Sequence, residues 1–242
     1  MAGHSKWKNI MHKKEKTDAQ RAKVFSKIGK EISMAVKDGG ADPVSNTRLR
    51  DLIAKAKSLN VPNDNIDRII KKAEGGDGEQ YEVVVYEGYG IGGVAVIVEA
   101  TTDNRNRTAA DVRHCFDKCG GNLGTTGCVS FLFNDKGVIV IDAEGTDEEK
   151  LMEDALECGA DDFDIDDGVI EVFTEVHELE AVRGALADKG YKIMSAEPDK
   201  LPTTYVALDD PEHITKLKKM LDMLEDNEDV TDLWHNWENQ SE

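Results

Sequence analysis

The chain has 242 residues, of which 39% are hydrophobic and 33% are charged, and its formal net charge is -19. Such a length allows a buried core and two or three domains. The longest uncharged apolar run, VAVIV at 94–98, is too short to cross a bilayer, and residues 1–30 lack the features of a secretory signal. We therefore expect a cytoplasmic protein without a membrane partner, whose four cysteines are buried and reduced.

The charge is divided unequally along the chain. Residues 1–75 contain 17 Lys and Arg against 9 Asp and Glu, a net charge of +8. The remaining 167 residues contain 13 against 40, a net charge of -27. Because a field of one sign attracts oppositely charged partners and repels like-charged ones, only the N-terminal part is suited to approach a polyanion.

The N-terminal region predicts three amphipathic helices. Apolar residues recur at helical spacing from Asp18 to Val36, from about Asn46 to Leu59, and again after Pro62. Three such helices with short loops predict a small bundle, and EGGDGEQ at 74–80 is the expected linker after it. The side of the first helix opposite its apolar stripe carries a row of lysines, Lys23, Lys27, Lys30 and Lys37.

Beyond the linker, the apolar pattern changes to that of strands. From residue 138 it predicts the βαββαβ order of a ferredoxin-like unit: strand 138–142, helix 147–158, strands 162–165 and 169–173, helix 178–188 and strand 191–196. On either side of this unit we expect strands near 82–86, 94–100 and 129–133, a helix at 105–119, a strand near 204–208, a helix at 211–225 and a strand at 230–236. The segments from 94 onward would complete a second βαββαβ unit.

The predicted fold is therefore α+β, with an N-terminal three-helix bundle followed by two ferredoxin-like α/β domains, the third domain being inserted into the second. The predicted domains are a basic helical domain at 1–77, a middle α/β domain at 78–135 plus 201–242, and an acidic inserted domain at 136–200.

No motif points to a reaction. The glycines of GYGIGG at 88–93 precede a strand rather than a helix, so they are expected to form a turn rather than bind phosphate. In HCFDKC at 114–119 both thiols share an apolar helix stripe, which favours buried cysteines over a zinc site. No catalytic triad, Walker loop or HExxH motif is present. We expect a protein that is not an enzyme and has no cofactor or metal.

The segment TTDNRNRTAADVRH at 101–114 allows two interpretations. Arg105 and Arg107, at the start of a helix, could hold phosphate oxygens with their guanidinium groups and the helix N–H groups. Alternatively, Asn104, Asn106 or Thr108 caps the helix while the arginines pair with nearby acids. The sequence does not favour either.

The N-terminal stretch GHSKWKNIMHKK also allows two roles. Its lysines could neutralise backbone phosphates while Trp7 stacks on an unpaired base or packs in a groove. Alternatively, Trp7 packs on the bundle together with Ile10 and Met11. The two roles are compatible, because basic arms often become ordered only on binding nucleic acid.

Four motifs together resemble the YebC family: MAGHSKWKNI, DNRNRTAADVRH, KCGGNLG and LWHNW. The resemblance covers nearly the whole chain and implies an N-terminal helical bundle followed by two α/β domains. Members of this family are labelled probable DNA-binding transcriptional regulators. Others, including the mitochondrial translational activator of cytochrome c oxidase, are implicated in translation, and one such role is the relief of ribosome stalling on proline-rich stretches.

The resemblance also implies a set of nucleic-acid-binding residues. The basic N-terminal motif of the family corresponds to His4, Ser5, Lys6, Trp7, Lys8, His12, Lys13 and Lys14. The cations of the first helix and of the 101–114 segment complete the predicted set with Arg21, Lys23, Lys27, Lys30, Arg105 and Arg107. Departures from the family pattern at Lys16, Thr17, Trp234 and Trp237 leave open which role within the family applies.

From these features we expect a nucleic-acid-binding regulator of gene expression. Because the sequence shows no helix-turn-helix or half-site dimer pattern, we favour a ribosome-associated translation factor that relieves stalling. The alternatives are a DNA-binding transcriptional regulator and an acidic protein-interaction module. The expected partners are rRNA or tRNA on the ribosome, or DNA, together with ribosomal proteins through the acidic domains of a monomeric chain.

Overall fold

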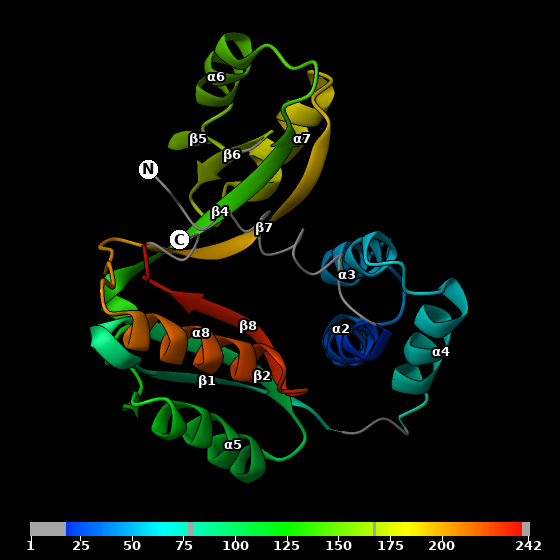
Figure 1. Cartoon of the computed structure of the whole chain (residues 1–242). Helices are drawn as coiled ribbons and strands as arrows, with labels where there is room; N and C mark the ends of the chain where they lie inside the picture. Colours follow the sequence, from blue (N-terminus) through cyan, green and yellow to red (C-terminus); the bar gives the residue numbers. More distant parts are fainter. Residues whose placement is uncertain (1–17, 77–79, 167, 239–242) are drawn as a thin grey trace. The chain divides into compact units, whose positions relative to one another are not determined.

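The structure is a computed structural model that describes residues 18–76, 80–166 and 168–238. Of these, residues 131–205 form one compact unit, the insert unit, and the described residues on both sides of it form a second, the main unit. The chain thus leaves the main unit, builds the insert unit and returns (Figure 1). The insertion predicted from the sequence is confirmed, whereas the predicted domain boundaries stay a prediction.

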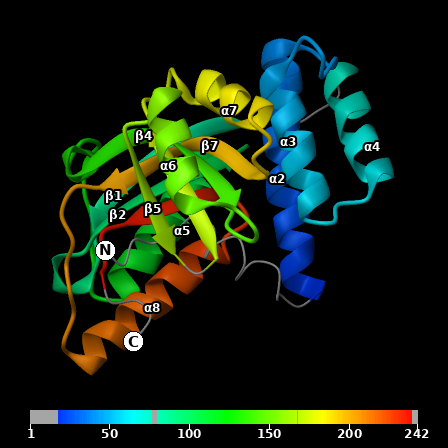
Figure 2. The ribbon, with the colours of Figure 1, turned by 90° about the horizontal axis from the view of Figure 1, so that it is seen from above.

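Three helices begin the main unit, namely α2 (Asp18–Gly39), α3 (Thr47–Ser58) and α4 (Asn63–Glu74). They lie side by side in both ribbon views (Figure 1, Figure 2). Their apolar stripes face one another and form a common core, whose buried members include Ile28, Ile32, Leu49, Ala56 and Ile66. The predicted helical bundle is confirmed.

Asn46 joins the first two helices of this bundle. Asn46 is 6% exposed, and its Oδ1 accepts the Leu49 N–H at 3.0 Å, as a residue that caps the start of α3 does. Its Nδ2 donates to the carbonyl oxygens of Ala35 and Gly40, both at 2.8 Å. One buried side chain therefore satisfies backbone groups at the end of α2 and at the start of α3.

The main unit also contains an antiparallel sheet with the strand order β3-β1-β2-β8. Its strands are β1 (Glu82–Tyr89), β2 (Ala95–Thr102), β3 (Asn122–Leu123) and β8 (Val230–His235). Helices α5 (Arg105–Lys118) and α8 (Pro211–Glu225) cover one face of it. The core between the sheet and these helices includes Val96, Val98, Phe116, Leu217 and Trp237.

The first glycine of GYGIGG, Gly88, lies in β1, and the other three, Gly90, Gly92 and Gly93, form the turn between β1 and β2. This turn contains a short 3-10 segment, η1 (Ile91–Gly93), in which Gly92 and Gly93 have φ angles of 75° and 82°. Residues with a Cβ rarely adopt this conformation. The interpretation of these residues as turn glycines is confirmed.

Two strands expected in the middle domain differ in the structure. At 129–133, Ser130–Leu132 forms a 3-10 turn, η2, and the next strand begins at Phe133. At 204–208, only Val206 makes an isolated bridge, to Trp237. The 204–208 strand was expected to lie next to β2 in the sheet, and β1 lies there instead. The strand order is therefore still that of a ferredoxin-like sheet.

A buried carboxylate explains the first of these differences. Glu87 of β1 is 4% exposed, and its two carboxylate oxygens accept the N–H groups of Gly127, Val129 and Ser130 at 2.8 to 2.9 Å. These N–H groups are therefore bonded to a side chain rather than to a neighbouring strand. Burial raises the pKa of Glu87, but the three backbone donors outweigh it and hold the pKa below its usual value.

The insert unit has the predicted βαββαβ order. Its strands form an antiparallel sheet in the order β5-β6-β4-β7, and its apolar core includes Ile139, Ile141, Leu151, Val182 and Leu186. This strand order is ferredoxin-like, as predicted. Its elements are β4 (Phe133–Asp142), α6 (Glu148–Glu157), β5 (Asp162–Asp166), β6 (Val169–Thr174), α7 (Leu179–Asp188) and β7 (Ile193–Pro202).

The cysteines are free thiols. Cys115 and Cys119 are buried in the core of the main unit as predicted, whereas Cys128 and Cys158 are partly exposed.

Within the described residues, no group of three or more His, Cys, Asp or Glu is placed to hold a metal ion. Among the helices of the same residues, none is both long and apolar enough to cross a membrane.

Candidate nucleic-acid interface

The predicted N-terminal motif lies outside the residues that the structure describes. The described part of the chain starts at Asp18. The following predicted site residues therefore lie outside it: His4, Ser5, Lys6, Trp7, Lys8, His12, Lys13 and Lys14. Arg21 belongs to α2, but its side chain is also outside what the structure describes. The role of all these residues in binding nucleic acid stays a prediction.

The three predicted lysines of α2 contact the turn between α8 and β8. The Lys23 ammonium donates to the carbonyl oxygen of Asp226 at 3.1 Å, and the Lys27 ammonium to that of Glu225 at 2.5 Å. Lys30 donates to the carbonyl oxygen of Glu228 at 3.0 Å. These three lysines were expected to face a polyanion, but in this structure their ammonium groups donate to oxygen atoms of the same chain. Cations are favoured at such a place, because the last carbonyls of a helix carry partial negative charge.

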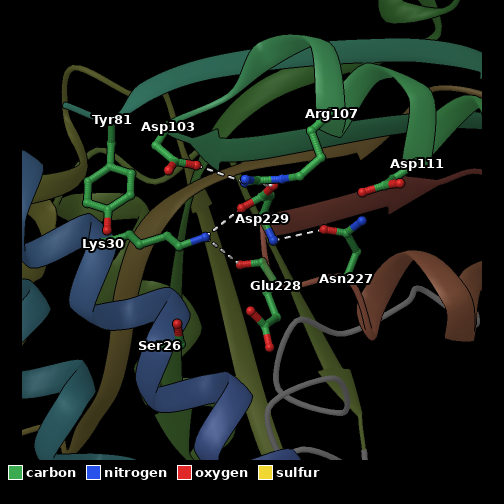
Figure 3. Close-up of a pocket in the computed structure, with 9 residues that line it drawn as sticks. All are labelled: Ser26, Lys30, Tyr81, Asp103, Arg107, Asp111, Asn227, Glu228 and Asp229. Atoms are coloured by element: carbon green, nitrogen blue, oxygen red, sulfur yellow. Dashed lines mark hydrogen bonds and ion pairs between the residues drawn. The ribbon is translucent and has the colours of Figure 1, made fainter. Parts of the chain in front are cut away.

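Asp229 is the centre of this contact. Its side chain is 6% exposed, and its carboxylate accepts hydrogen bonds from Lys30 at 2.6 Å, Arg107 at 2.8 Å and Thr108 at 2.8 Å. Figure 3 shows the ammonium and guanidinium groups converging on this carboxylate from α2 and α5. A buried carboxylate is stable only when such partners compensate its charge.

The pKa of Asp229 reflects this balance. Burial favours the neutral acid and so raises the pKa. The hydrogen bonds from Lys30, Arg107 and Thr108 favour the charged form more strongly, and they lower the pKa from its usual 3.8 to about 2. Asp229 is therefore ionised throughout the neutral range.

Backbone and side-chain bonds on both sides hold Asp229 in place. Its carbonyl oxygen accepts the N–H of Thr101 near the end of β2 at 2.7 Å. Its own N–H donates to Oδ1 of Asn227 at 2.8 Å. The hydroxyl of Thr102 adds a longer contact to the carboxylate at 3.3 Å. The turn thus fixes Asp229 against the edge of the sheet where α5 begins.

In the 101–114 segment, the helix cap and the pairing of Arg107 agree with the second of the two interpretations. Asn104 caps α5, because its Oδ1 accepts the Arg107 N–H at 3.1 Å. The Arg107 guanidinium pairs with Asp103 and Asp229, both at 2.8 Å, and these bonds raise its pKa. Arg105 differs, since its side chain is exposed and forms no ion pair with the residues that the structure describes. The binding roles of Arg105 and Arg107 stay predictions.

A polar pocket of roughly 530 Å³ opens beside Asp229 (Figure 3). Its lining contains two cations and four carboxylates, so it disfavours an anionic ligand while its present ion pairs hold. Figure 3 shows Tyr81 beside the Lys30 side chain, whose ammonium lies 5.8 Å from the centre of the Tyr81 ring. The lining residues are Ser26, Lys30, Tyr81, Asp103, Arg107, Asp111, Asn227, Glu228 and Asp229.

The sequence gives no local sign of this site. Asp229 is 122 positions from Arg107 and 199 from Lys30, and it is one acid among 49. Its position directly after a predicted helix and before a predicted strand indicates only a turn. The pairing becomes visible only when the chain has folded and brought the middle of α2, the start of α5 and the turn before β8 together.

Two family models match the chain. The model described as the TACO1/YebC protein N-terminal domain matches residues 5–76. The model described as the TACO1/YebC second and third domain matches residues 81–237. These ranges agree with a helical N-terminal region followed by two further α/β regions.

Relatives and a solved structure agree with these models. A probable transcriptional regulatory protein of Acetivibrio thermocellus is 57% identical over 239 residues, which cover 98% of this chain and 99% of that protein. A protein of the same name from Finegoldia magna is 52% identical over 241 residues, covering 99% and 100%. The crystal structure of a conserved hypothetical protein from Aquifex aeolicus has a TM-score of 0.83 and 47% identity, and the match covers 93% of each chain. The chain belongs to the TACO1/YebC family.

Proposed function

We propose that this chain is a nucleic-acid-binding regulator of gene expression, that it is not an enzyme, and that its target is DNA. The names of its relatives support regulation of transcription, since those from Acetivibrio thermocellus and Finegoldia magna are called probable transcriptional regulatory proteins. Identity above 50% over nearly the full length makes their names relevant to this chain.

The observation that carries the proposal is the concentration of positive charge in the first 75 residues. The insert unit, residues 131–205, contains only 6 Lys and Arg against 21 Asp and Glu. The helical bundle, in contrast, has exposed cations on α3 and α4 besides the lysine row of α2. They are Arg48, Arg50, Lys57, Arg68, Lys71 and Lys72. Electrostatic attraction would therefore bring a polyanion to this end of the chain, and the acidic insert unit would oppose contact elsewhere.

The proposal is tested by binding of a fluorescent DNA duplex at several salt concentrations. We compare wild type with a variant in which four N-terminal lysines, Lys6, Lys8, Lys13 and Lys14, are replaced by alanine. A matched control removes four lysines of the acidic insert unit, Lys150, Lys189, Lys192 and Lys200. The proposal predicts that only the first variant loses affinity. Equal binding by both variants would contradict it.

A ribosome-associated translation factor is the second candidate. Its support is the resemblance to a family that includes a mitochondrial translational activator, and it would place the same basic end on rRNA or tRNA. Sedimentation of the protein with ribosomes distinguishes the two targets. Cosedimentation that is lost in the N-terminal variant, together with weak duplex binding that an RNA competitor abolishes, would favour the ribosome over DNA.

A further inference from the structure

The turn between α8 and β8 has the character of a short polyanion. Residues 225–229, which we call the clamp turn, read EDNED, so that four of the five side chains are acidic. The carbonyl oxygens of Glu225, Asp226 and Glu228 accept the ammonium groups of α2, and the Asp229 carboxylate adds a full negative charge. Oxygen acceptors with negative charge are also what a nucleic-acid backbone presents to lysines.

The lysines of α2 are spaced as a row that could bind such a backbone. Lys23, Lys27 and Lys30 follow each other at intervals of four and three residues on one side of the helix. At a rise of 1.5 Å per residue, the row is about 10 Å long. A row of this length can contact more than one phosphate of a nucleic-acid strand.

We propose that the clamp turn covers a phosphate-binding face of α2, and that a nucleic-acid backbone displaces the turn and takes over its lysines. This inference rests on the proposed function, because it names an additional surface through which the nucleic acid is bound. In the closed state, the clamp turn competes with the ligand and lowers the apparent affinity.

The exposure of the contacts indicates how the clamp would open. The Lys23 and Asp226 side chains are 35% and 60% exposed and 3.5 Å apart, and an ion pair of this kind contributes about 0 to 1 kcal/mol. The Lys30 and Asp229 side chains are 12% and 6% exposed. Phosphates can therefore exchange with the acceptors of Lys23 at low cost, and opening would proceed along α2 toward Lys30.

Asp229 would not be left unpaired when Lys30 is released. Its carboxylate also accepts hydrogen bonds from Arg107 and Thr108, and both donors come from α5, which belongs to the sheet side of the contact. An uncompensated buried charge, the usual penalty for breaking a buried ion pair, is thereby avoided. This second set of donors makes Lys30 the replaceable partner.

The first experiment compares Asp229→Asn with Asp111→Asn in the duplex-binding assay. Both substitutions raise the net charge by one and both residues line the same pocket, but of the two it is Asp229 that accepts a hydrogen bond from α2. The clamp predicts that Asp229→Asn increases affinity by about fivefold or more relative to Asp111→Asn, because the closed state is weakened. Equal affinities of the two variants would overturn it.

A second experiment uses the wild-type chain, so that it does not depend on the folding of a variant. Hydrogen exchange of peptides that contain residues 225–230 is measured with and without unlabelled duplex. Displacement of the clamp turn predicts faster exchange on binding, including at the Asp229 N–H that Asn227 holds in the closed state. Binding with unchanged or slower exchange overturns the clamp alone. A lack of duplex binding by wild type and Asp229→Asn at low salt overturns both the clamp and the proposed function.

Discussion

Replacement of Asp229 with asparagine removes the charge around which the main unit gathers a lysine, an arginine and two threonines. The pKa of Asp229 is lowered from 3.8 to about 2, which corresponds to a free-energy preference for the charged form of about 2 to 3 kcal/mol. Loss of one partner from a buried ion pair costs about 3 to 5 kcal/mol, and the amide oxygen of asparagine recovers part of this. We therefore expect Asp229→Asn to lower the free energy of unfolding of the main unit by about 2 to 3 kcal/mol at pH 7.

The sign of the pH dependence follows from the lowered pKa. The carboxylate stabilises the folded state fully above the pKa of the unfolded chain, and this contribution is lost as the pH falls from about 4 toward 2. The difference in unfolding free energy between wild type and Asp229→Asn should therefore shrink over that range. Asp111→Asn, an exposed carboxylate of the same pocket, should change stability by less than about 0.5 kcal/mol.

Urea unfolding followed by tryptophan fluorescence measures both effects. In a Trp7→Phe background the remaining tryptophans are Trp234 and Trp237, both in the main unit, and Trp237 is fully buried in its core. Asp229→Asn within about 0.5 kcal/mol of wild type at pH 7 would refute the reasoning. So would a difference between the two proteins that is as large at pH 3 as at pH 7.

The other predictions concern single residues of the main unit. Asn46→Ala removes a helix cap and two hydrogen bonds and should destabilise the bundle by about 2 to 3 kcal/mol in urea unfolding, whereas Asn46→Asp keeps the cap and should cost less. Glu87→Gln should lower the protection of residues 124–130 against hydrogen exchange, measured relative to the intrinsic exchange rate at the same pH. Acidification of wild type below the normal glutamate pKa should also lower this protection, because the lowered pKa of Glu87 means that its stabilising charge is lost as the pH falls. Arg107→Ala should lower the thermal midpoint by several degrees, while Arg105→Ala should leave it unchanged and weaken duplex binding; a stability loss for Arg105→Ala would show that it has a structural role.

The helices and the insert unit could be predicted from the sequence because their signals are local. The helical bundle follows from apolar residues at helical spacing, and the insert unit follows from alternating strand and helix patterns of ordinary length. In both places the residues that form the core are also the apolar residues whose spacing indicates a helix or a strand. Examples are Ile28 and Ile32 in α2, and Ile139 and Ile141 in β4.

The segment at 129–133 could not be predicted in the same way. Its apolar residues have the composition of a strand, but three N–H groups in or next to it are bonded to Glu87, about 40 residues earlier in the chain. A propensity describes what a segment favours by itself, and it cannot include an acceptor that arrives from another strand. The hydrogen bonds of Asp229 could not be predicted for the same reason, because their donors belong to α2 and α5, which are distant in the sequence.

The charge pattern of the sequence predicted where the cations lie, but not which of them are already bonded to other parts of the chain. Lys23, Lys27 and Lys30 share one side of α2 as expected, and Arg107 lies at the start of a helix as expected. Each of these four side chains nevertheless contacts oxygen atoms of the chain itself. Arg107 pairs with Asp103 and Asp229, whereas Arg105, in the same motif, forms no ion pair with the described residues, and only the folded structure distinguishes the two.

The central claim, that the basic N-terminal end binds nucleic acid through backbone phosphates, is tested most directly by the salt dependence of duplex binding. The logarithm of the binding constant is plotted against the logarithm of salt concentration for wild type and for the Lys6, Lys8, Lys13, Lys14 to alanine variant. Each phosphate contact contributes about 0.9 to the slope. The account predicts a slope that is smaller by about 3 to 4 in the variant. An unchanged slope would contradict it.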